Sequence, residues 1–359
     1  MNISDKVERL IRPEIRASHA YSVPEATGMV KLDAMENPYP WPSEVKQAWL
    51  ETLREVEVNR YPDPDPGRLK QLLGEAMGAP PGTGLLLGNG SDELIQIVLL
   101  ATARPDACVL APVPTFVMYQ VIANAVGMRF VGVPLGRDFV LDVPAMREAL
   151  QHHKPAVTFI AYPNNPSGNL FAADAIEGLI AAAPGLVVID EAYFAFTDAS
   201  FIARLPDLDN LLVLRTLSKM GLAGLRLGLL LGAEAWIREF NKVRLPYNIN
   251  SLTQASVELL LRKRDFMAKQ IQHIRAERQR LFATLESLPG VKPWPSETNF
   301  LLFRVPDARH VYDALFASGV LVKNLDAADK TLEGCLRVTV GTPQENDVFL
   351  DALKRILTT

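Results

Sequence analysis

The sequence predicts an α/β protein with a mostly parallel, seven-stranded sheet between helices, followed by a smaller α+β domain. Short apolar runs alternate with longer helical patterns over residues 85–232. The pattern then becomes that of a long charged helix, and further strand and helix candidates follow it. The chain has 359 residues, which is enough for about two domains at roughly 150 residues each.

Seven apolar runs rich in Val, Ile and Leu are the expected strands, because strands of a parallel sheet are buried on both faces. They are Leu85–Leu87, Cys108–Ala111, Phe130–Val133, Val157–Ala161, Leu186–Asp190, Leu211–Leu214 and Leu227–Leu231. Helical periodicity between them is clear at Ser91–Ala101 and Asp174–Ala182. This alternation favours parallel strands connected by helices.

The pattern changes after residue 250. One long helix is expected from Ser251 to Leu288, where Pro289 and Gly290 end it. The elements expected beyond it are strands at Asn299–Arg304, Val320–Lys323 and Cys335–Val340, and helices near Ala308–Ser318 and Gln344–Leu357. We therefore expect an N-terminal arm (1–30), a large domain (31–250), and a connecting helix with a small C-terminal domain (251–359).

The composition is that of an ordinary globular protein. The 37 basic and 41 acidic residues give a net charge of −4, and no basic run exceeds Arg262–Arg264, which disfavours a nucleic-acid partner. No run of 18 apolar residues and no secretory-signal pattern occurs, so we expect no membrane partner and a cytoplasmic location. Cys108 and Cys335 are expected to be buried free thiols.

Several familiar motifs are missing. The sequence has no Gly-Lys dipeptide of a phosphate-binding Walker loop, no G-x-G-x-x-G after an apolar run, and no G-x-S-x-G nucleophile turn. The five histidines and two cysteines show no metal-ligand spacing, so we expect no metal.

Four segments that follow expected strands carry the candidate chemistry, because ligands of open α/β sheets bind beyond the carboxyl ends of the strands. In Gly88–Glu93, the backbone N–H groups of Ser91 and Asp92 can bind an anion, although a plain helix cap is the simpler interpretation of this segment alone. In Tyr162–Gly168, Asn165 can donate to a ligand oxygen, and an ordinary turn is the alternative.

The other two segments contain an acid and an amine. Asp190 ends an apolar run, where a carboxylate needs a partner such as a cationic ring nitrogen; a structural ion pair or cap is the alternative. Lys219 lies between an apolar run and a Gly-rich loop, where a lysine loses its proton and becomes a nucleophile, whereas most lone lysines are surface charges. Pyridoxal 5′-phosphate is one ligand that would use all four segments.

The motifs in this order resemble the class I and II aminotransferases of fold type I over nearly the whole chain. They are E-N-P-Y (Glu36–Tyr39), R-Y-P-D-P (Arg60–Pro64), G-N-G-S-D-E (Gly88–Glu93), P-T-F (Pro114–Phe116), P-N-N-P-S-G (Pro163–Gly168), D-E-A-Y (Asp190–Tyr193), T-L-S-K (Thr216–Lys219), A-G-L-R-L-G (Ala223–Gly228), T-N-F (Thr298–Phe300) and L-R-V-T-V-G-T (Leu336–Thr342). The resemblance implies a transaminase. It is strongest to the members that exchange an amino group between L-histidinol phosphate and 2-oxoglutarate in histidine biosynthesis.

The resemblance also implies roles for individual residues. Lys219 would bind the cofactor aldehyde and then move the substrate proton, and Asp190 would keep the ring nitrogen protonated. Asn165 and Tyr193 would hydrogen-bond the ring hydroxyl, and Phe116 would stack on the ring. The cofactor phosphate would be bound by Ser91, Asp92, Thr216, Ser218 and Arg226, and by Tyr61 of a neighbouring subunit, which implies a homodimer.

The resemblance implies a substrate pocket as well. Arg337 would bind the anionic group of either substrate, because one bidentate arginine fits both a carboxylate and a phosphate. Tyr21 of the arm would cover the substrate, and Asn165 and Lys323 would contact it.

The chain departs from the family pattern at three positions. Arg226 lies seven residues after Lys219, where many relatives have one residue more between the two, Lys323 replaces a common Arg, and Met35 replaces a common Asn.

Three other activities stay open from the sequence alone. Two share the fold: a threonine-phosphate decarboxylase-like lyase and an aromatic amino acid aminotransferase. The third is a non-catalytic pyridoxal-binding regulator, which we disfavour because 359 residues leave no room for a helix-turn-helix domain beside this fold.

Overall fold

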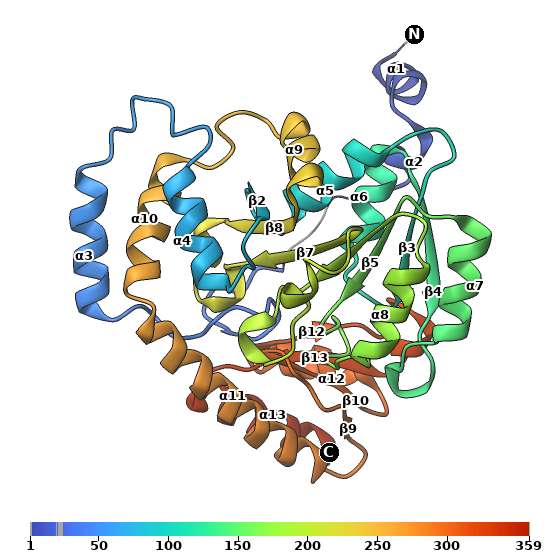
Figure 1. The fold of residues 1–359 in the computed structure, drawn as a ribbon. Coiled ribbons are helices and arrows are strands. Elements are labelled where there is room, and N and C mark those ends of the chain that lie inside the picture. The colour runs from blue at the N-terminus through green and yellow to red at the C-terminus, as the bar shows by residue number, and fades with distance from the viewer. Residues whose placement is uncertain (1, 19, 21–23, 359) are drawn as a thin grey trace.

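A computed structural model of the chain describes residues 2–18, 20 and 24–358. Its largest sheet has seven strands in the order β2-β8-β7-β6-β5-β3-β4 (Figure 1). β8 runs antiparallel to both neighbours, and the other four pairings are parallel. The strands are β2 (Thr83–Gly88), β3 (Cys108–Val113), β4 (Arg129–Pro134), β5 (Val157–Ala161), β6 (Leu186–Asp190), β7 (Leu211–Thr216) and β8 (Gly228–Ala233). Each expected apolar run overlaps one strand, so the predicted mostly parallel sheet is confirmed.

Helices cover both faces of this sheet, which explains why its central strands are apolar throughout. Val188 of β6 joins the core on one face, and Val187 and Ile189 join the core on the other. The first face is covered by α5 (Ser91–Thr102), α6 (Met118–Val126) and α9 (Glu234–Val243). The second face is covered by α4 (Gly67–Met77), α7 (Val143–His153), α8 (Ala173–Ala182) and α10 (Ser251–Arg262). Short 3₁₀ turns occur at Arg137–Phe139, Phe194–Phe196, Ile202–Arg204, Ser218–Met220, Ala223–Leu225 and Lys330–Leu332.

A second sheet has four antiparallel strands in the order β12-β13-β10-β9 (Figure 1). Its elements are β9 (Lys292–Pro293), β10 (Phe300–Arg304), β12 (Lys323–Asn324) and β13 (Cys335–Thr339), with helices α11 (Asp265–Glu286), α12 (Ala308–Ala317) and α13 (Pro343–Thr358) around them. The expected strand at Val320–Lys323 is wrong as a single element. β11 (Val320–Leu321) pairs with β1 (Val30–Lys31), whereas β12 pairs with β13, because the two halves find different partners.

The long helix expected from Ser251 to Leu288 is also wrong as a single element. It is divided into α10 and α11, and both residues between them, Lys263 and Arg264, are exposed. Arg264 occupies the position where the spacing of the buried residues Leu260 and Met267 calls for an apolar side chain. Val257 and Leu260 of α10 pack in the core of the large sheet, whereas Ile274, Leu281 and Leu285 of α11 pack in the core around the second sheet, so the two helices have different partners.

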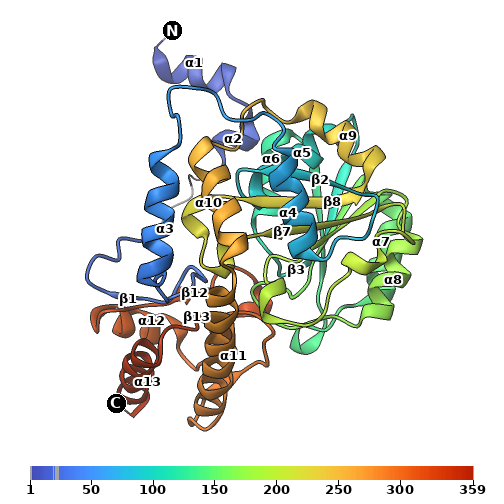
Figure 2. The same cartoon turned by 60° about the vertical axis from the view of Figure 1, so that its left-hand side comes forward.

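The N-terminal arm contains α1 (Ile3–Leu10) and α2 (Pro13–Arg16), neither of which has a buried residue. α1 projects beyond the rest of the molecule in both views (Figures 1 and 2). Arg12, which precedes α2, bonds to the carbonyl of Ala125 at the end of α6. The boundaries of the arm (1–30), the large domain (31–250) and the connecting helix with the small domain (251–359) stay a prediction.

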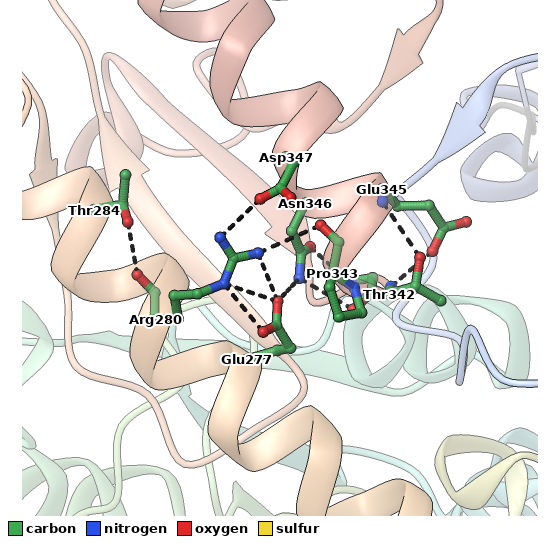
Figure 3. Close-up of polar contacts among 9 residues, drawn as sticks. Glu277, Arg280, Thr284, Thr342, Pro343, Glu345, Asn346 and Asp347 are labelled. Carbon is green, nitrogen blue, oxygen red and sulfur yellow. Dashed lines mark hydrogen bonds and ion pairs between the residues drawn. The ribbon is translucent and has the colours of Figure 1, made fainter.

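A polar network joins α13 to α11 (Figure 3). Arg280 of α11 binds Glu277 and Asp347, at 2.8 Å and 2.7 Å respectively. The buried Asn346 donates from Nδ2 to Glu277 Oε2 over 2.9 Å, and its Oδ1 accepts from the backbone N–H of Gly341 over 2.9 Å. These contacts fix the turn that follows β13, the strand on which Arg337 lies.

Candidate active site

A cavity of about 240 Å³ lies where β2, β5, β6 and β7 end at the carboxyl edge of the large sheet. Ten of the eleven residues predicted to bind the cofactor line it: Ser91, Asp92, Phe116, Asn165, Asp190, Tyr193, Thr216, Ser218, Lys219 and Arg226. They come from segments that are far apart in the sequence and that the parallel topology brings to one edge. The structure therefore brings these ten residues together in a single place, without Tyr61.

Lys219 lies in the 3₁₀ turn that directly follows β7. Its Nζ donates to the carbonyl oxygen of Ala34 over 3.2 Å. Burial, and next the charge of Arg337, lower the pKa of this amine to about 8. At pH 7 roughly a tenth of Lys219 is consequently unprotonated, far more than for an ordinary lysine, and this is the state that a nucleophilic amine needs.

Asp190 is the last residue of β6 and is buried. Its Oδ1 accepts from the backbone N–H of Ala192 over 3.0 Å, and its Oδ2 accepts from the Tyr119 hydroxyl over 2.6 Å. Burial raises the pKa of this carboxyl to about 6, although the two hydrogen bonds lower it. The contact with Tyr119 was not expected, because this residue follows the P-T-F motif by three positions and no feature of the sequence marks it.

Tyr193 and Asn165 approach the cavity from separate loops. Tyr193 is buried, packs edge-on against Phe300 with ring centroids 5.2 Å apart, and its pKa is raised by burial. Asn165 Oδ1 accepts from Arg337 Nη1 over 2.7 Å, which leaves its amide nitrogen as the donor for a ligand. Phe116 lines the cavity as well and supplies an aromatic surface.

One end of the cavity has the features of an anion-binding site. Gly90 has a φ of +87° and places Ser91 and Asp92 in the first turn of α5, where the backbone N–H groups have no partner in the helix. A Cβ at Gly90 would lie 2.5 Å from an Arg226 guanidinium nitrogen, so the absence of a side chain lets the arginine approach the helix.

Hydroxyl groups complete this end of the cavity. The Thr216 and Ser218 hydroxyls lie 2.9 Å apart, and Arg226 Nη1 donates to the Ser218 hydroxyl over 3.3 Å. The short spacing between Lys219 and Arg226 does not keep the arginine out of the cavity, since both residues line it.

A second cavity, of about 250 Å³, shares Met35, Phe116 and Asn165 with the first. Lys323 and Arg337 both line it and are directly opposite each other in the β12–β13 pair, so their side chains lie on one face of the sheet. Two basic groups thus face a space that adjoins Lys219, as a pocket for an anionic substrate requires.

The segment around Met35 connects the two cavities and was not expected to do so. Met35 has a φ of +53°, a conformation that Asn adopts more readily than other side chains. Its backbone N–H donates to Thr339 Oγ1 over 2.9 Å, and its carbonyl accepts from Asn299 over 2.9 Å. These two contacts hold Met35 in a strained conformation and explain how it can replace the Asn of many relatives.

Among the predicted residues that the structure describes, Tyr61 lines neither cavity. Tyr61 is 79% exposed and stacks on Tyr247, with ring centroids 4.4 Å apart. Tyr21 lies outside the described residues. Lys323, Arg337 and Asn165, the other predicted substrate contacts, all line the second cavity.

A buried ion pair next to Asp190 was also missed. Glu191 accepts from Arg215 Nε over 2.9 Å and from its Nη2 over 2.8 Å, and the same guanidinium lies 4.4 Å from the centroid of the Phe194 ring.

Within the described residues no cluster of His, Cys, Asp and Glu could hold a metal. None of the described helices combines the length and the apolar character that a membrane span needs. Cys108 and Cys335 are buried and free, as predicted.

The residues present fit pyridoxal 5′-phosphate. The cavity has an anion-binding end, an amine of lowered pKa and an aromatic surface. Asp190 is a buried carboxylate whose two hydrogen-bond donors are both neutral, so it can still accept from a cationic ring nitrogen. Together with the mostly parallel sheet, this donor set defines the class as that of the pyridoxal-phosphate enzymes with an α/β fold.

The chain belongs to the aminotransferase class I and II family, whose sequence model matches residues 27–353. It is 53% identical over 352 residues to histidinol-phosphate aminotransferase 2 of Nitrosococcus oceani, with 98% of each chain covered. The family match confirms the expected fold type and the prediction of pyridoxal phosphate as cofactor.

Solved structures show the same fold. The histidinol-phosphate aminotransferase of Sinorhizobium meliloti, in complex with pyridoxal-5′-phosphate, matches with a TM-score of 0.86 at 24% identity and covers 97% of this chain and 98% of its own. The L-threonine-O-3-phosphate decarboxylase of Porphyromonas gingivalis matches with a TM-score of 0.77 at 21% identity and covers 92% and 100%. The fold alone does not separate the two activities.

Proposed function

We propose that this protein is a transaminase that transfers an amino group between L-histidinol phosphate and 2-oxoglutarate, giving imidazole acetol phosphate and glutamate, in histidine biosynthesis. The observation that supports this most directly is the position of the Lys323–Arg337 pair in a cavity that adjoins the cavity of Lys219 and Asp190. The relative at 53% identity, which carries the name of this activity, adds independent support.

The cofactor, when bound, supplies an aldehyde that accepts the amino group and a cationic ring that withdraws electrons from the substrate carbon. Lys219 would be the nucleophile toward that aldehyde and then the base that moves the substrate proton, since its pKa of about 8 leaves part of it unprotonated. Asp190 would keep a proton on the ring nitrogen by presenting a negative charge to it.

The other residues of the first cavity would bind and orient the cofactor. Tyr193 and Asn165 would hydrogen-bond the ring hydroxyl, and Phe116 would cover one face of the ring. The start of α5 and the nearby side chains would hold the phosphate, namely Ser91, Asp92, Thr216, Ser218 and Arg226.

The second cavity accounts for the choice of substrate. Arg337 binds the carboxylate of glutamate or the phosphate ester of histidinol phosphate, because a planar guanidinium fits both anions. Lys323 lies opposite Arg337 and adds a point charge for the phosphate, which carries more negative charge than a carboxylate. Tyr21 of the arm is proposed to cover this pocket.

A homodimer with shared active sites is a further part of the proposal. Tyr61 is exposed in a single chain and stacks on the exposed Tyr247, and the two segments that carry them also expose Val58, Leu245 and Leu252. α1 also exposes an apolar stripe, formed by Ile3, Val7 and Leu10. Exposed apolar patches of this kind are typical of protein interfaces. We propose that Tyr61 binds the cofactor phosphate of the partner subunit.

We also propose that the enzyme is cytoplasmic. Free cysteines such as Cys108 persist in that reducing compartment.

Sedimentation velocity tests the homodimer, and we expect a dimer at micromolar concentration. Tyr61→Phe should then weaken binding of the cofactor, and Tyr247→Phe, which keeps the stacked ring, serves as its control. A monomer with full activity would contradict the shared site.

A substrate comparison tests the activity itself. The purified protein with pyridoxal phosphate is assayed with 2-oxoglutarate and, in turn, histidinol phosphate, phenylalanine, tyrosine and leucine as amino donors. We expect the highest kcat/KM for histidinol phosphate, and Arg337→Lys should lower it for both that donor and glutamate. The substrate assignment fails if an aromatic or branched amino acid is preferred. Release of carbon dioxide from threonine phosphate, without transamination, would establish the lyase instead.

A further inference from the structure

Tyr119 lies beside the candidate active site, on α6, and lines neither cavity. Its hydroxyl donates to Asp190 Oδ2 over 2.6 Å, and the only polar group on its ring is used in this contact. Tyr119 is 0% exposed and Asp190 is 4% exposed, so water does not compete for the bond. The two residues are 71 positions apart in the sequence.

The ring of Tyr119 is fixed by packing on two sides. It stacks on Phe159 of β5, with ring centroids 4.6 Å apart and an interplanar angle of 11°. It also meets Phe116 edge to face, with centroids 5.6 Å apart at 86°. The hydroxyl therefore has a defined position, set by the central sheet on one side and by a residue of the cofactor cavity on the other.

We propose that Tyr119 is a positioning residue that holds the Asp190 carboxylate ionised and oriented for the ring nitrogen of the cofactor. This inference rests on the proposed function. The carboxylate and the ring nitrogen share one proton. A hydroxyl that donates to the carboxylate stabilises its anionic form, so the proton stays on nitrogen and the ring keeps its positive charge.

The charges around Asp190 show why such a donor is needed. Burial, together with the negative charges of Asp92 on α5 and of the adjacent Glu191, raises the pKa of Asp190. The hydrogen bonds from Tyr119 and from the Ala192 backbone lower it. Glu191 is itself paired with Arg215, and Tyr193 is the other titratable neighbour. Without the Tyr119 hydroxyl, only the Ala192 N–H would lower the pKa of Asp190, while burial and the two acids would still raise it.

The first test uses the cofactor-free protein and the variant Tyr119→Phe, which keeps the ring and removes the hydroxyl. The free energy of unfolding is measured by urea denaturation from pH 4 to pH 8. The pKa of Asp190 is raised on folding, so the folded state binds more protons and stability falls as pH rises up to that pKa. In the variant the pKa is higher, and the fall should continue to a higher pH than in the wild type.

Tyr312→Phe is the matched control, because Tyr312 lies on α12 of the small domain and loses the same hydroxyl group. Its pH curve should have the wild-type shape. Curves of the same shape for Tyr119→Phe and the wild type would overturn the proposal.

The second test uses the enzyme with saturating pyridoxal phosphate. We expect kcat of Tyr119→Phe to fall about tenfold or more, because the variant loses one hydrogen bond to a charged group. KM for the amino donor should change little. A merely structural role would lower Tm and leave kcat unchanged, which would overturn the proposal. If the wild type itself does not transaminate, the proposed function fails, and the cofactor-free curves still decide whether Tyr119 controls Asp190.

Discussion

Two neighbouring carboxylates at the carboxyl end of β6 have partners of different charge. Glu191 is 0% exposed and binds the guanidinium of Arg215 through two hydrogen bonds of 2.9 Å and 2.8 Å. Asp190 is almost as deeply buried, and its donors, the Tyr119 hydroxyl and the Ala192 N–H, are neutral. The carboxylate with a cationic partner stabilises the fold. The carboxylate without one still requires a cation, and we propose that the cofactor ring supplies it.

The largest effect on activity is expected at Asp190. Asp190→Asn keeps the shape of the side chain and removes the charge, so kcat should fall about 10²- to 10³-fold. The unfolding free energy of the cofactor-free variant should not decrease, because a buried charge without a cationic partner is removed. Steady-state kinetics and urea denaturation check both statements. Turnover near the wild-type value would contradict the role of Asp190.

Glu191 should show the opposite behaviour. Glu191→Gln leaves Arg215 buried without its counter-charge, and breaking such a pair costs about 3–5 kcal/mol of unfolding free energy. The folded fraction of the variant should keep a kcat close to that of the wild type. Urea denaturation measures the loss, and the double variant Glu191→Gln/Arg215→Gln should recover part of it. A loss below about 1 kcal/mol would show that the pair is not needed for stability.

The pH dependence of stability tests the burial of Asp190. The pKa of Asp190 rises from 3.8 to about 6 on folding, so the folded state binds the extra proton in this range. Stability of the cofactor-free protein should therefore fall as pH rises from about 4 to about 6, by about 2 kcal/mol. Asp190→Asn should remove this component, whereas a wild-type slope in that variant would assign it to another group.

The smallest effect is expected for an ion pair at the surface. Arg275 binds Asp198 over 3.2 Å, but Asp198 is 90% exposed. Water and salt screen such a pair, so Asp198→Ala should leave Tm unchanged within the error of differential scanning calorimetry. A clear loss of Tm would mean that burial does not explain the importance of the Glu191–Arg215 pair.

The sequence alone was sufficient to predict candidate site residues where they directly follow strands. Asp190 and Lys219 were found because a charged residue at the end of an apolar run in an α/β pattern points to the ligand-binding edge. Their neighbours were not found. The contacts of Tyr119 with Asp190 and of Arg215 with Glu191 depend on which elements pack together, and no local pattern records this.

The same reason explains the errors in the fold. The helix from Ser251 and the strand from Val320 each have one continuous pattern, yet each is divided because its parts pack on different partners. Met35 shows the same dependence on distant partners, since its left-handed backbone is held by Thr339 and Asn299, which lie 304 and 264 positions away. Local periodicity predicts elements well and their partners poorly.

Attachment of the cofactor to Lys219 is the central claim, and chemical trapping tests it most directly. The protein is loaded with pyridoxal phosphate, reduced with borohydride, digested and mapped by mass spectrometry. We predict one pyridoxyl-modified peptide, labelled at Lys219 and missing from a Lys219→Ala variant. A label on a different lysine, or no labelled peptide, would contradict the account.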